Sequence, residues 1–316
     1  MKKYVLNVKN LSKLYIYTDM EKICKKLSVQ RNVSKTIPAV SQFIGDTNQI
    51  GETNNYILLL NNNINSINID KENNIANIFA NEKNFFFPDL VYLAIGMIAN
   101  DLQKKDMYFV QSSVVKYDDT HSIMLLGDPN SGKTSMAYSL MKNYGYSLIS
   151  NDNVLINSNK TICGTKDVQM RYGAIKLFFP EILPYIDVPK EDEGRNEWDI
   201  KIYINDYLDS QGFGTSDDSI ITDIYNIKTY KHGDTFIKKR EYIDEILLMY
   251  EHITKQIRSN RYAIVSMNYP LPSFEKEEYM QNRYDIAVDM TNNVEIYDAQ
   301  GTIKSLTRSI GKKYER

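Results

Sequence analysis

Alternation of apolar and polar residues dominates the first 87 residues of the chain and predicts β-strands. Residues 1–8 alternate in this way, as a strand with one buried face does. Three further short apolar runs are separated by Asn-rich turns, at residues 56–60, 64–69 and 75–79. Because strands joined by such turns commonly pair with each other, the pattern predicts a β-meander within a strand-rich N-terminal portion.

Apolar residues recur at intervals of three and four in two longer segments, which predicts amphipathic helices. The first runs from Pro88, where proline fits a first helical turn, to about Lys105, and its apolar face comprises Leu90, Leu93, Ile95, Ile98 and Leu102. The second runs from Glu241 to about Ser259. Further short apolar runs predict strands at residues 107–110, 113–115, 122–126, 286–290 and 294–297.

Polar segments and element content suggest how the chain is divided. Residues 45–54 and 189–197 are poor in apolar side chains and predict exposed loops, the first being the best candidate for a mobile one. The strand-rich portion covers residues 1–87, and the α/β remainder, residues 88–316, forms a second domain.

Composition narrows the class of protein. The 316 residues are 42% hydrophobic and 25% charged, and 38 Lys and Arg oppose 40 Asp and Glu, so no net charge attracts nucleic acid or an anionic membrane. Cys24 and Cys163 lie far apart without metal-ligand spacing, which argues against a zinc site or a disulfide framework. No apolar run approaches the ~18 residues of a membrane span and no secretory leader is evident, so we expect a cytoplasmic protein.

The candidate chemistry centres on a G-x-x-x-x-G-K-T motif, which comprises Gly127, Asp128, Pro129, Asn130, Ser131, Gly132, Lys133 and Thr134. An apolar run precedes it and a helical pattern, 134–144, follows with Ser135 in its first turn. This is the context of a phosphate-binding loop, in which backbone N–H groups and the positive helix end attract an anion. Lys133 would reach the β- and γ-phosphates and Thr134 would hold Mg²⁺. The motif therefore predicts ATP and Mg²⁺ as cofactors.

A second set of polar residues follows the predicted helix. An apolar run leads to Asn151, Asp152 and Asn153, so that Asp152 comes 19 positions after Lys133. A strand that ends there would bring the carboxylate beside the phosphates, where it can hold Mg²⁺ or accept a proton from an attacking hydroxyl. The alternative is a polar turn between two strands.

Residues 127–156 resemble the core of the HPr kinase/phosphorylase family, protein kinases related in fold to phosphoenolpyruvate carboxykinase. The resemblance extends over about residues 85–180 and includes the helix from Pro88 and the strand region 109–115. It implies a mixed-sheet P-loop core and phosphoryl transfer to a hydroxyl. Some relatives phosphorylate precursor peptides in lasso-peptide clusters, which implies a role in peptide natural-product biosynthesis.

Two positions depart from the family pattern. Gln111 stands where the family has a histidine, and Asn151 stands where it has the first Asp of a pair. In the family the two carboxylates divide metal binding and proton transfer, so Asp152 would carry both roles here. Alternatively the chain binds nucleotide without transferring phosphate.

Arg171 is a third catalytic candidate, since an arginine in this region can stabilise a transferring phosphate; the alternative is a surface arginine. The polar segment 189–201 around Trp198 suggests a substrate lid or, alternatively, a solvated loop.

The sequence thus predicts a kinase that acts on a hydroxyl of a peptide, a protein or a small molecule, with neither nucleic acid nor membrane as partner and with homo-oligomerisation left open. The rival interpretations are a nucleotide-binding switch or scaffold and an ATP-dependent carboxylate-activating enzyme.

Overall fold

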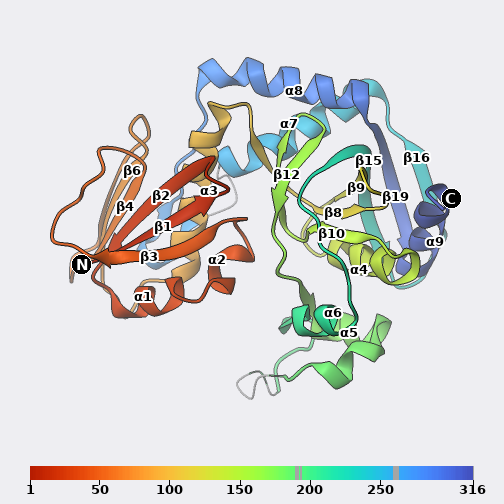
Figure 1. The fold of residues 1–316 in the computed structure, drawn as a ribbon, viewed down its shortest axis with the longest axis horizontal. Helices are drawn as coiled ribbons and strands as arrows, with labels where there is room; N and C mark the ends of the chain where they lie inside the picture. The colour runs from red at the N-terminus through yellow and green to blue at the C-terminus, as the bar shows by residue number, and fades with distance from the viewer. Residues whose placement is uncertain (189–191, 193, 259–262, 316) are drawn as a thin grey trace. The chain divides into compact units, whose positions relative to one another are not determined.

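The computed structural model describes residues 1–188, 192, 194–258 and 263–315. They form two compact units (Figure 1): residues 1–110, 155–158 and 246–290 in the first, and residues 111–154, 159–245 and 291–316 in the second. The predicted helix from Pro88 belongs to the first unit. Within the described ranges, no helix has the length and apolar character needed to cross a bilayer.

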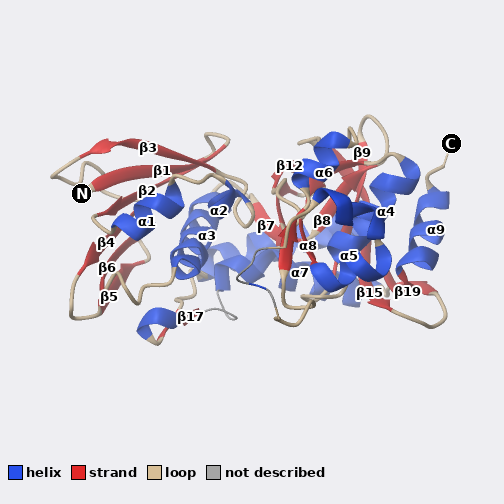
Figure 2. Cartoon of the chain, turned by 90° about the horizontal axis from the view of Figure 1, so that it is seen from below, coloured by secondary structure: helices blue, strands red, loops and turns tan. Residues whose placement is uncertain are grey.

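The first unit is built on a six-stranded mixed sheet with the order β3-β1-β2-β4-β6-β5. Its strands are β1 (Lys2–Val8), β2 (Ser12–Thr18), β3 (Val40–Asp46), β4 (Tyr56–Asn61), β5 (Ser66–Asp70) and β6 (Ile75–Ala80). Helices α1 (Glu21–Leu27), α2 (Arg31–Ser34) and α3 (Phe87–Gln103) lie beside these strands (Figure 2). The sheet is stabilised by burial of apolar side chains from both layers, such as Ile16, Ile57, Ile23 and Leu93. The strand-rich N-terminal portion and the mixed α/β class are therefore confirmed.

The predicted meander is wrong, although its three strands exist. β4 pairs with β6 in parallel, and β5 pairs with β6 antiparallel on the outer side. β6 is apolar enough to be an interior strand, since Ala76 and Ile78 are fully buried, whereas polar β5 lies at the edge. Edge positions tolerate polar strands because one side remains in water.

The predicted strand at 286–290 is also wrong, because these residues lie within helix α8 (Met280–Asn293). Arg283, Ala287 and Met290 are all fully buried, and their spacing of four and three residues places them on one helical face. A short apolar run does not distinguish a strand from a segment of a buried helix. Helix α7 (Tyr242–Arg258) confirms the second predicted helix, apart from residue 259, which lies outside the described residues.

The remaining elements of the first unit are β7 (Tyr108–Gln111), most of β11 (Asn153–Asn157), β17 (Ala263–Ile264), β18 (Tyr269–Pro270) and the 3₁₀ turns η3 (Val265–Met267) and η4 (Glu277–Tyr279).

A buried polar chain links α3 to α8 within the first unit. Arg283 has no exposed surface, and its guanidinium donates to Gln103 Oε1 and to Glu275 Oε1, both at 2.9 Å. Arg258 also donates to Glu275, at 2.9 and 3.1 Å. The Arg258 guanidinium holds the pKa of the Glu275 carboxyl below its ordinary value. Burial raises this pKa, but the charges of Arg258 and Arg283 outweigh burial.

We expect Arg283→Met to destabilise the first unit by about 2 kcal/mol, because Gln103 Oε1 loses a charged donor in a buried place. The loss stays moderate because Glu275 keeps Arg258. Hydrogen exchange should accelerate roughly thirtyfold in α3 and α8 and remain unchanged in the second unit. Arg308→Met, on an exposed arginine of the second unit, is the matched control; equal exchange in α3 of the two variants would contradict the prediction.

The second unit contains most of a nine-stranded mixed sheet whose main path is β10-β8-β9-β15-β12-β11-β7, with β19 pairing β15 and β16 pairing β19. Its strands are β8 (Ser113–Lys116), β9 (His121–Leu126), β10 (Ser147–Ser150), β12 (Lys160–Gly164), β15 (Ser219–Tyr230), β16 (Phe236–Lys239) and β19 (Glu295–Thr302). A small pair, β13 (Gln169–Arg171) and β14 (Lys201–Tyr203), stands apart from it.

Helices of the second unit pack against this sheet and against each other. They are α4 (Lys133–Tyr144), α5 (Tyr172–Phe178), the 3₁₀ helix η1 (Pro180–Tyr185), α6 (Asn205–Ser210) and α9 (Ile303–Lys313). Met136 and Leu140 of α4 and Leu306 of α9 share one buried cluster with Leu125 of β9 and Ile227 of β15. This packing holds the start of α4 beside the ends of β9 and β15.

Candidate functional site

The G-x-x-x-x-G-K-T segment connects the end of β9 to the start of α4, so the predicted order of strand, loop and helix is confirmed. Three of its residues have positive φ: Gly127 at 135°, Asn130 at 68° and Gly132 at 99°. Asparagine is one of the few residues with a side chain that adopts this region readily. The Ser131 N–H donates to Asp128 O at 3.1 Å and closes a turn, while Asp128, Pro129 and Asn130 are exposed at its tip.

Both motif glycines are required by the close approach of β15. A Cβ on Gly132 would lie 2.2 Å from Thr229 Oγ1, and one on Gly127 would lie 2.6 Å from the carbonyl oxygen of Ile227. Thr229 in turn holds the loop, because its N–H and its hydroxyl donate to Ser131 O at 2.9 and 3.0 Å. A side chain at either glycine would push the loop away from the strand.

Lys133, the first residue of α4, folds its side chain back over the loop. Its Nζ donates to Gly127 O at 2.7 Å and to Asp128 O at 3.0 Å. The ammonium group therefore lies beside the same turn whose N–H groups would face an anion. Thr134 and Ser135 follow in the first helical turn, the former half-buried and the latter 9% exposed.

Two buried side-chain oxygens of the site have no hydrogen-bond partner among the described residues: Ser131 Oγ and Asn151 Oδ1. Each residue is 8% exposed. Unsatisfied buried polar atoms are costly and uncommon, and these two belong to the two loops that the sequence singled out. They are the kind of group that a bound polar ligand or water satisfies.

Asp152 follows β10 and is oriented by two side-chain amides. Gln111 Nε2 donates to its Oδ1 at 3.3 Å and Asn153 Nδ2 donates to its Oδ2 at 3.2 Å. Its backbone is held as well, because the Asp152 N–H donates to Thr165 Oγ1 at 2.9 Å and the Asp152 carbonyl accepts from Ser112 N–H at 2.8 Å. Gln111 thus contacts Asp152 directly.

Sheet topology brings Asp152 to the same edge as residues 127–134, named the phosphate loop for their predicted role. β10 and β9 both run antiparallel to β8, which lies between them. Val114 of β8 pairs with Ser150 on one side and with Met124 on the other. Ser150, the last residue of β10, is therefore level with Met124, two residues before the end of β9. The two strands lie two strand spacings, about 10 Å, apart.

Arg171 contacts the phosphate loop. Its Nε and Nη2 donate to Asn130 Oδ1 at 3.1 and 2.9 Å, and its Nη1 donates to Trp198 O. The side chain is about one third exposed. Arg171 therefore connects the exposed tip of the loop to the segment around Trp198, rather than standing alone on the surface.

The proposed lid, residues 189–201, is described only in part, because residues 189–191 and 193 lie outside the described residues. Trp198 lies against α5, since a Cβ on Gly173 would come within 2.8 Å of its ring. Lys201 begins β14 and pairs with Arg171 in the two-stranded sheet.

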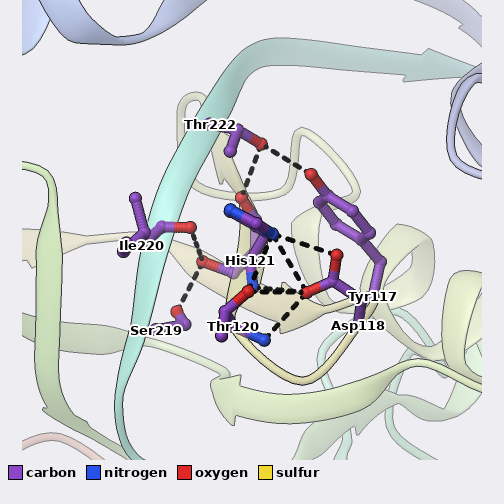
Figure 3. A network of polar contacts seen from close by, with 8 residues as sticks. Tyr117, Asp118, Thr120, His121, Ser219, Ile220 and Thr222 are labelled. Atoms are coloured by element: carbon purple, nitrogen blue, oxygen red, sulfur yellow. Dashed lines mark hydrogen bonds and ion pairs between the residues drawn. The ribbon is translucent and has the colours of Figure 1, made fainter.

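His121 lies at the start of β9, at the opposite end from the phosphate loop, and Figure 3 shows its polar contacts. Its Nδ1 lies 3.0 Å from Asp118 Oδ2 and 2.9 Å from Thr120 Oγ1. Burial raises the pKa of the Asp118 carboxyl, but N–H donors from Thr120 and His121 and the imidazole outweigh it and lower that pKa. This network stabilises a turn and takes no part in the candidate site.

In the part of the chain that the structure describes, no three His, Cys, Asp or Glu side chains gather as a metal site. One carboxylate and a hydroxyl nevertheless suit Mg²⁺, which is commonly held by one or two carboxylates together with phosphate oxygens and water.

No protein-family model matches this chain, and no curated protein sequence matches it significantly. The resemblance to the HPr kinase/phosphorylase family therefore remains an expectation from the sequence motifs.

Thr229 and Thr165 are site residues that the sequence did not indicate. Thr229 lies 98 positions from Ser131, and no local pattern marks one threonine of a long strand as a loop contact. Thr165 follows β12 and reaches Asp152 through the same edge of the sheet. A hydroxyl residue just after a predicted strand would have been the signal for it.

Proposed function

We propose that this chain is an ATP- and Mg²⁺-dependent kinase with an HPr kinase-like core, which transfers the γ-phosphoryl group to a hydroxyl of a peptide, a protein or a small molecule. The observation that carries the proposal is that two features lie at one sheet edge. They are the glycine-dependent loop after β9, whose carbonyls accept from Lys133, and the oriented Asp152 carboxylate after β10. Phosphoryl transfer requires little more than positioning and charge stabilisation.

The residues present fit the proposed ligands. The start of α4 offers N–H groups and the positive end of a twelve-residue helix. Ser131 Oγ is a buried hydroxyl that still needs a partner. Thr134 and Asp152 would hold Mg²⁺, which neutralises charge on the phosphates when bound.

Each residue then has a role that its position supports. Lys133 would exchange its two loop carbonyls for phosphate oxygens and stabilise charge that develops during transfer. The acceptor hydroxyl oxygen forms a bond to the γ-phosphorus while the bond to the ADP oxygen breaks, and its proton passes to the Asp152 carboxylate. The Gln111 side chain is not ionisable, so it would not accept the proton itself. Its amide would orient Asp152.

Incubation with γ-labelled ATP, Mg²⁺ and hydroxyl-bearing peptides tests the proposal. Label on an acceptor hydroxyl is the expected result. Nucleotide binding without turnover would indicate a switch or scaffold, for which the neutral Asn151 and Gln111 are the motivating residues, and release of AMP would indicate a carboxylate-activating enzyme.

Arg171→Ala is expected to lower turnover about tenfold more than it lowers Mg-ATP affinity, because a guanidinium beside the loop acts mainly on charge that forms in the transition state. Kinetics and calorimetry on the same preparations measure the two effects. Arg195→Ala, at a mainly exposed arginine that pairs with Asp192, is the control. Equal losses in affinity and turnover would indicate that Arg171 contacts the nucleotide. No loss in either would indicate that Arg171 takes no part in binding or transfer.

A further inference from the structure

A basic segment, residues 228–240, leaves the same edge of the second sheet as the phosphate loop. It contains Lys228, Lys231, Lys238, Lys239 and Arg240 against a single acidic residue, Asp234. The chain as a whole carries slightly more acidic than basic residues. Residues 230–239 are all exposed. The positive charge is therefore concentrated on one accessible strip, the basic edge, which comprises these 13 residues.

Part of this charge is available to a partner. Arg240 donates to Asp298 Oδ1 at 3.0 and 2.8 Å, and Lys239 lies 3.4 Å from Glu295. Among the described residues no carboxylate pairs with Lys231 or Lys238. Lys228 Nζ lies over the ring of Tyr230, 5.7 Å from the ring centre. An unpaired ammonium group on a surface favours an anionic partner.

The basic edge begins next to the phosphate loop. Thr229 donates twice to Ser131 O, and Lys231 follows it by two residues, about 7 Å of extended chain. The edge then returns as β16, which pairs antiparallel with β19 from Phe236 opposite Gln300 to Lys239 opposite Tyr297. A partner seated here would lie within reach of the loop.

β16 also offers its backbone. In the described part of the sheet its one neighbour is β19, so the outer N–H and C=O groups of β16 remain free for another strand. Phe236 and Ile237 are 51% and 37% exposed. Because side chains alternate along a strand, Phe236 shares a face with Lys238. The strand therefore presents hydrogen-bonding groups, apolar surface and positive charge together.

We propose that the basic edge docks an acidic peptide segment in extended conformation, which adds to β16 as a further strand and brings an acceptor hydroxyl toward the phosphate loop. This proposal names the substrate class and rests on the proposed kinase function. Backbone pairing supplies affinity in such complexes, and side chains on alternate positions supply specificity. A nucleic acid has no amide backbone to pair with β16, so the free strand edge favours a peptide over a polyanion of that kind.

Fluorescence anisotropy with a labelled synthetic peptide of alternating Glu and Thr tests the docking in the absence of nucleotide. Lys231→Ser with Lys238→Ser is expected to weaken binding about five- to tenfold at low salt, and added salt should weaken binding to the wild type. Lys160→Ser is the matched control. Lys160 is exposed and pairs with Ile220 at the other end of β15, about 33 Å from Tyr230, so binding should be unchanged.

Strand addition has its own test. Two peptides of the same charge, N-methylated at the odd or at the even positions, lose different sets of backbone donors, and one of them should bind at least about tenfold more weakly. Unchanged binding of the double lysine variant, or equal binding of a Lys-Thr peptide, would overturn the proposal. So would binding of duplex DNA or anionic vesicles that depends on Lys231 and Lys238 and exceeds binding of the peptide.

Failure of this proposal differs from failure of the kinase proposal. Binding of the Glu-Thr peptide without binding of Mg-ATP would support the docking proposal and contradict the kinase proposal. Phosphorylation of hydroxyls together with unchanged peptide binding in the double lysine variant would support the kinase proposal and contradict the docking proposal.

Discussion

Replacing Lys133 by Ala is expected to weaken Mg-ATP binding about a hundredfold and to lower turnover about a thousandfold or more. The ammonium group that now caps Gly127 O and Asp128 O is the charge available to the phosphates at this loop, and charge-assisted contacts of this kind are strong. Alanine is a good helix former, so α4 should persist. The two carbonyls lie at the edge of an exposed loop and can accept from water instead.

Calorimetry measures the affinity, and the fluorescence of Trp198 gives an independent titration. Trp198 is the single tryptophan of the chain, and Arg171 joins its carbonyl to Asn130 at the tip of the loop. Lys142→Ala, nine residues along the same helix and paired with Glu181, should leave affinity and turnover unchanged. Wild-type affinity in Lys133→Ala would refute the assignment of the loop to phosphate binding.

Asp152→Asn is expected to lower turnover about a thousandfold while the fold remains intact. The substitution keeps the shape of the side chain and an oxygen that can accept from Gln111, but it removes the carboxylate needed to accept a proton or to hold Mg²⁺. Affinity for ATP in the absence of Mg²⁺ should be unchanged. Initial rates of label transfer and calorimetry with and without Mg²⁺ measure these two expectations.

Asp209→Asn, at an exposed aspartate of α6, is the matched control and should retain wild-type turnover. A wild-type rate in Asp152→Asn would show that the base or the metal ligand lies elsewhere. A loss of ATP affinity in the absence of Mg²⁺ would instead place the carboxylate in direct contact with the nucleotide pocket.

The phosphate loop was the most predictable part of this protein, because its determinants are local. The apolar run before Gly127, the glycine spacing and the helical pattern after Lys133 lie within about 23 consecutive residues, and the structure forms a strand, a loop and a helix there. The strands of the N-terminal portion and helices α3 and α7 were predictable for the same reason, since periodicity reflects the local backbone.

Strand pairing was not predictable from such patterns. β4, β5 and β6 were expected to pair in sequence, but polar β5 is found at the edge and β6 lies between the other two. The choice depends on which strand gains most from burial on both sides, and that depends on the rest of the sheet. α8 shows the same limit, because its buried face includes Arg283, a residue that no hydrophobic pattern places inside.

The sequence by itself determined the local pattern: a glycine-containing loop between a strand and a helix, and a carboxylate after a strand. Tertiary structure alone decided what these meet. Thr229 supports Ser131, Gln111 orients Asp152, Arg171 reaches Asn130, and the basic segment becomes a free sheet edge beside the loop. The physical reason is that each of these contacts joins residues about 40 to 100 positions apart, whose proximity arises from strand order and helix packing rather than from the sequence around either partner.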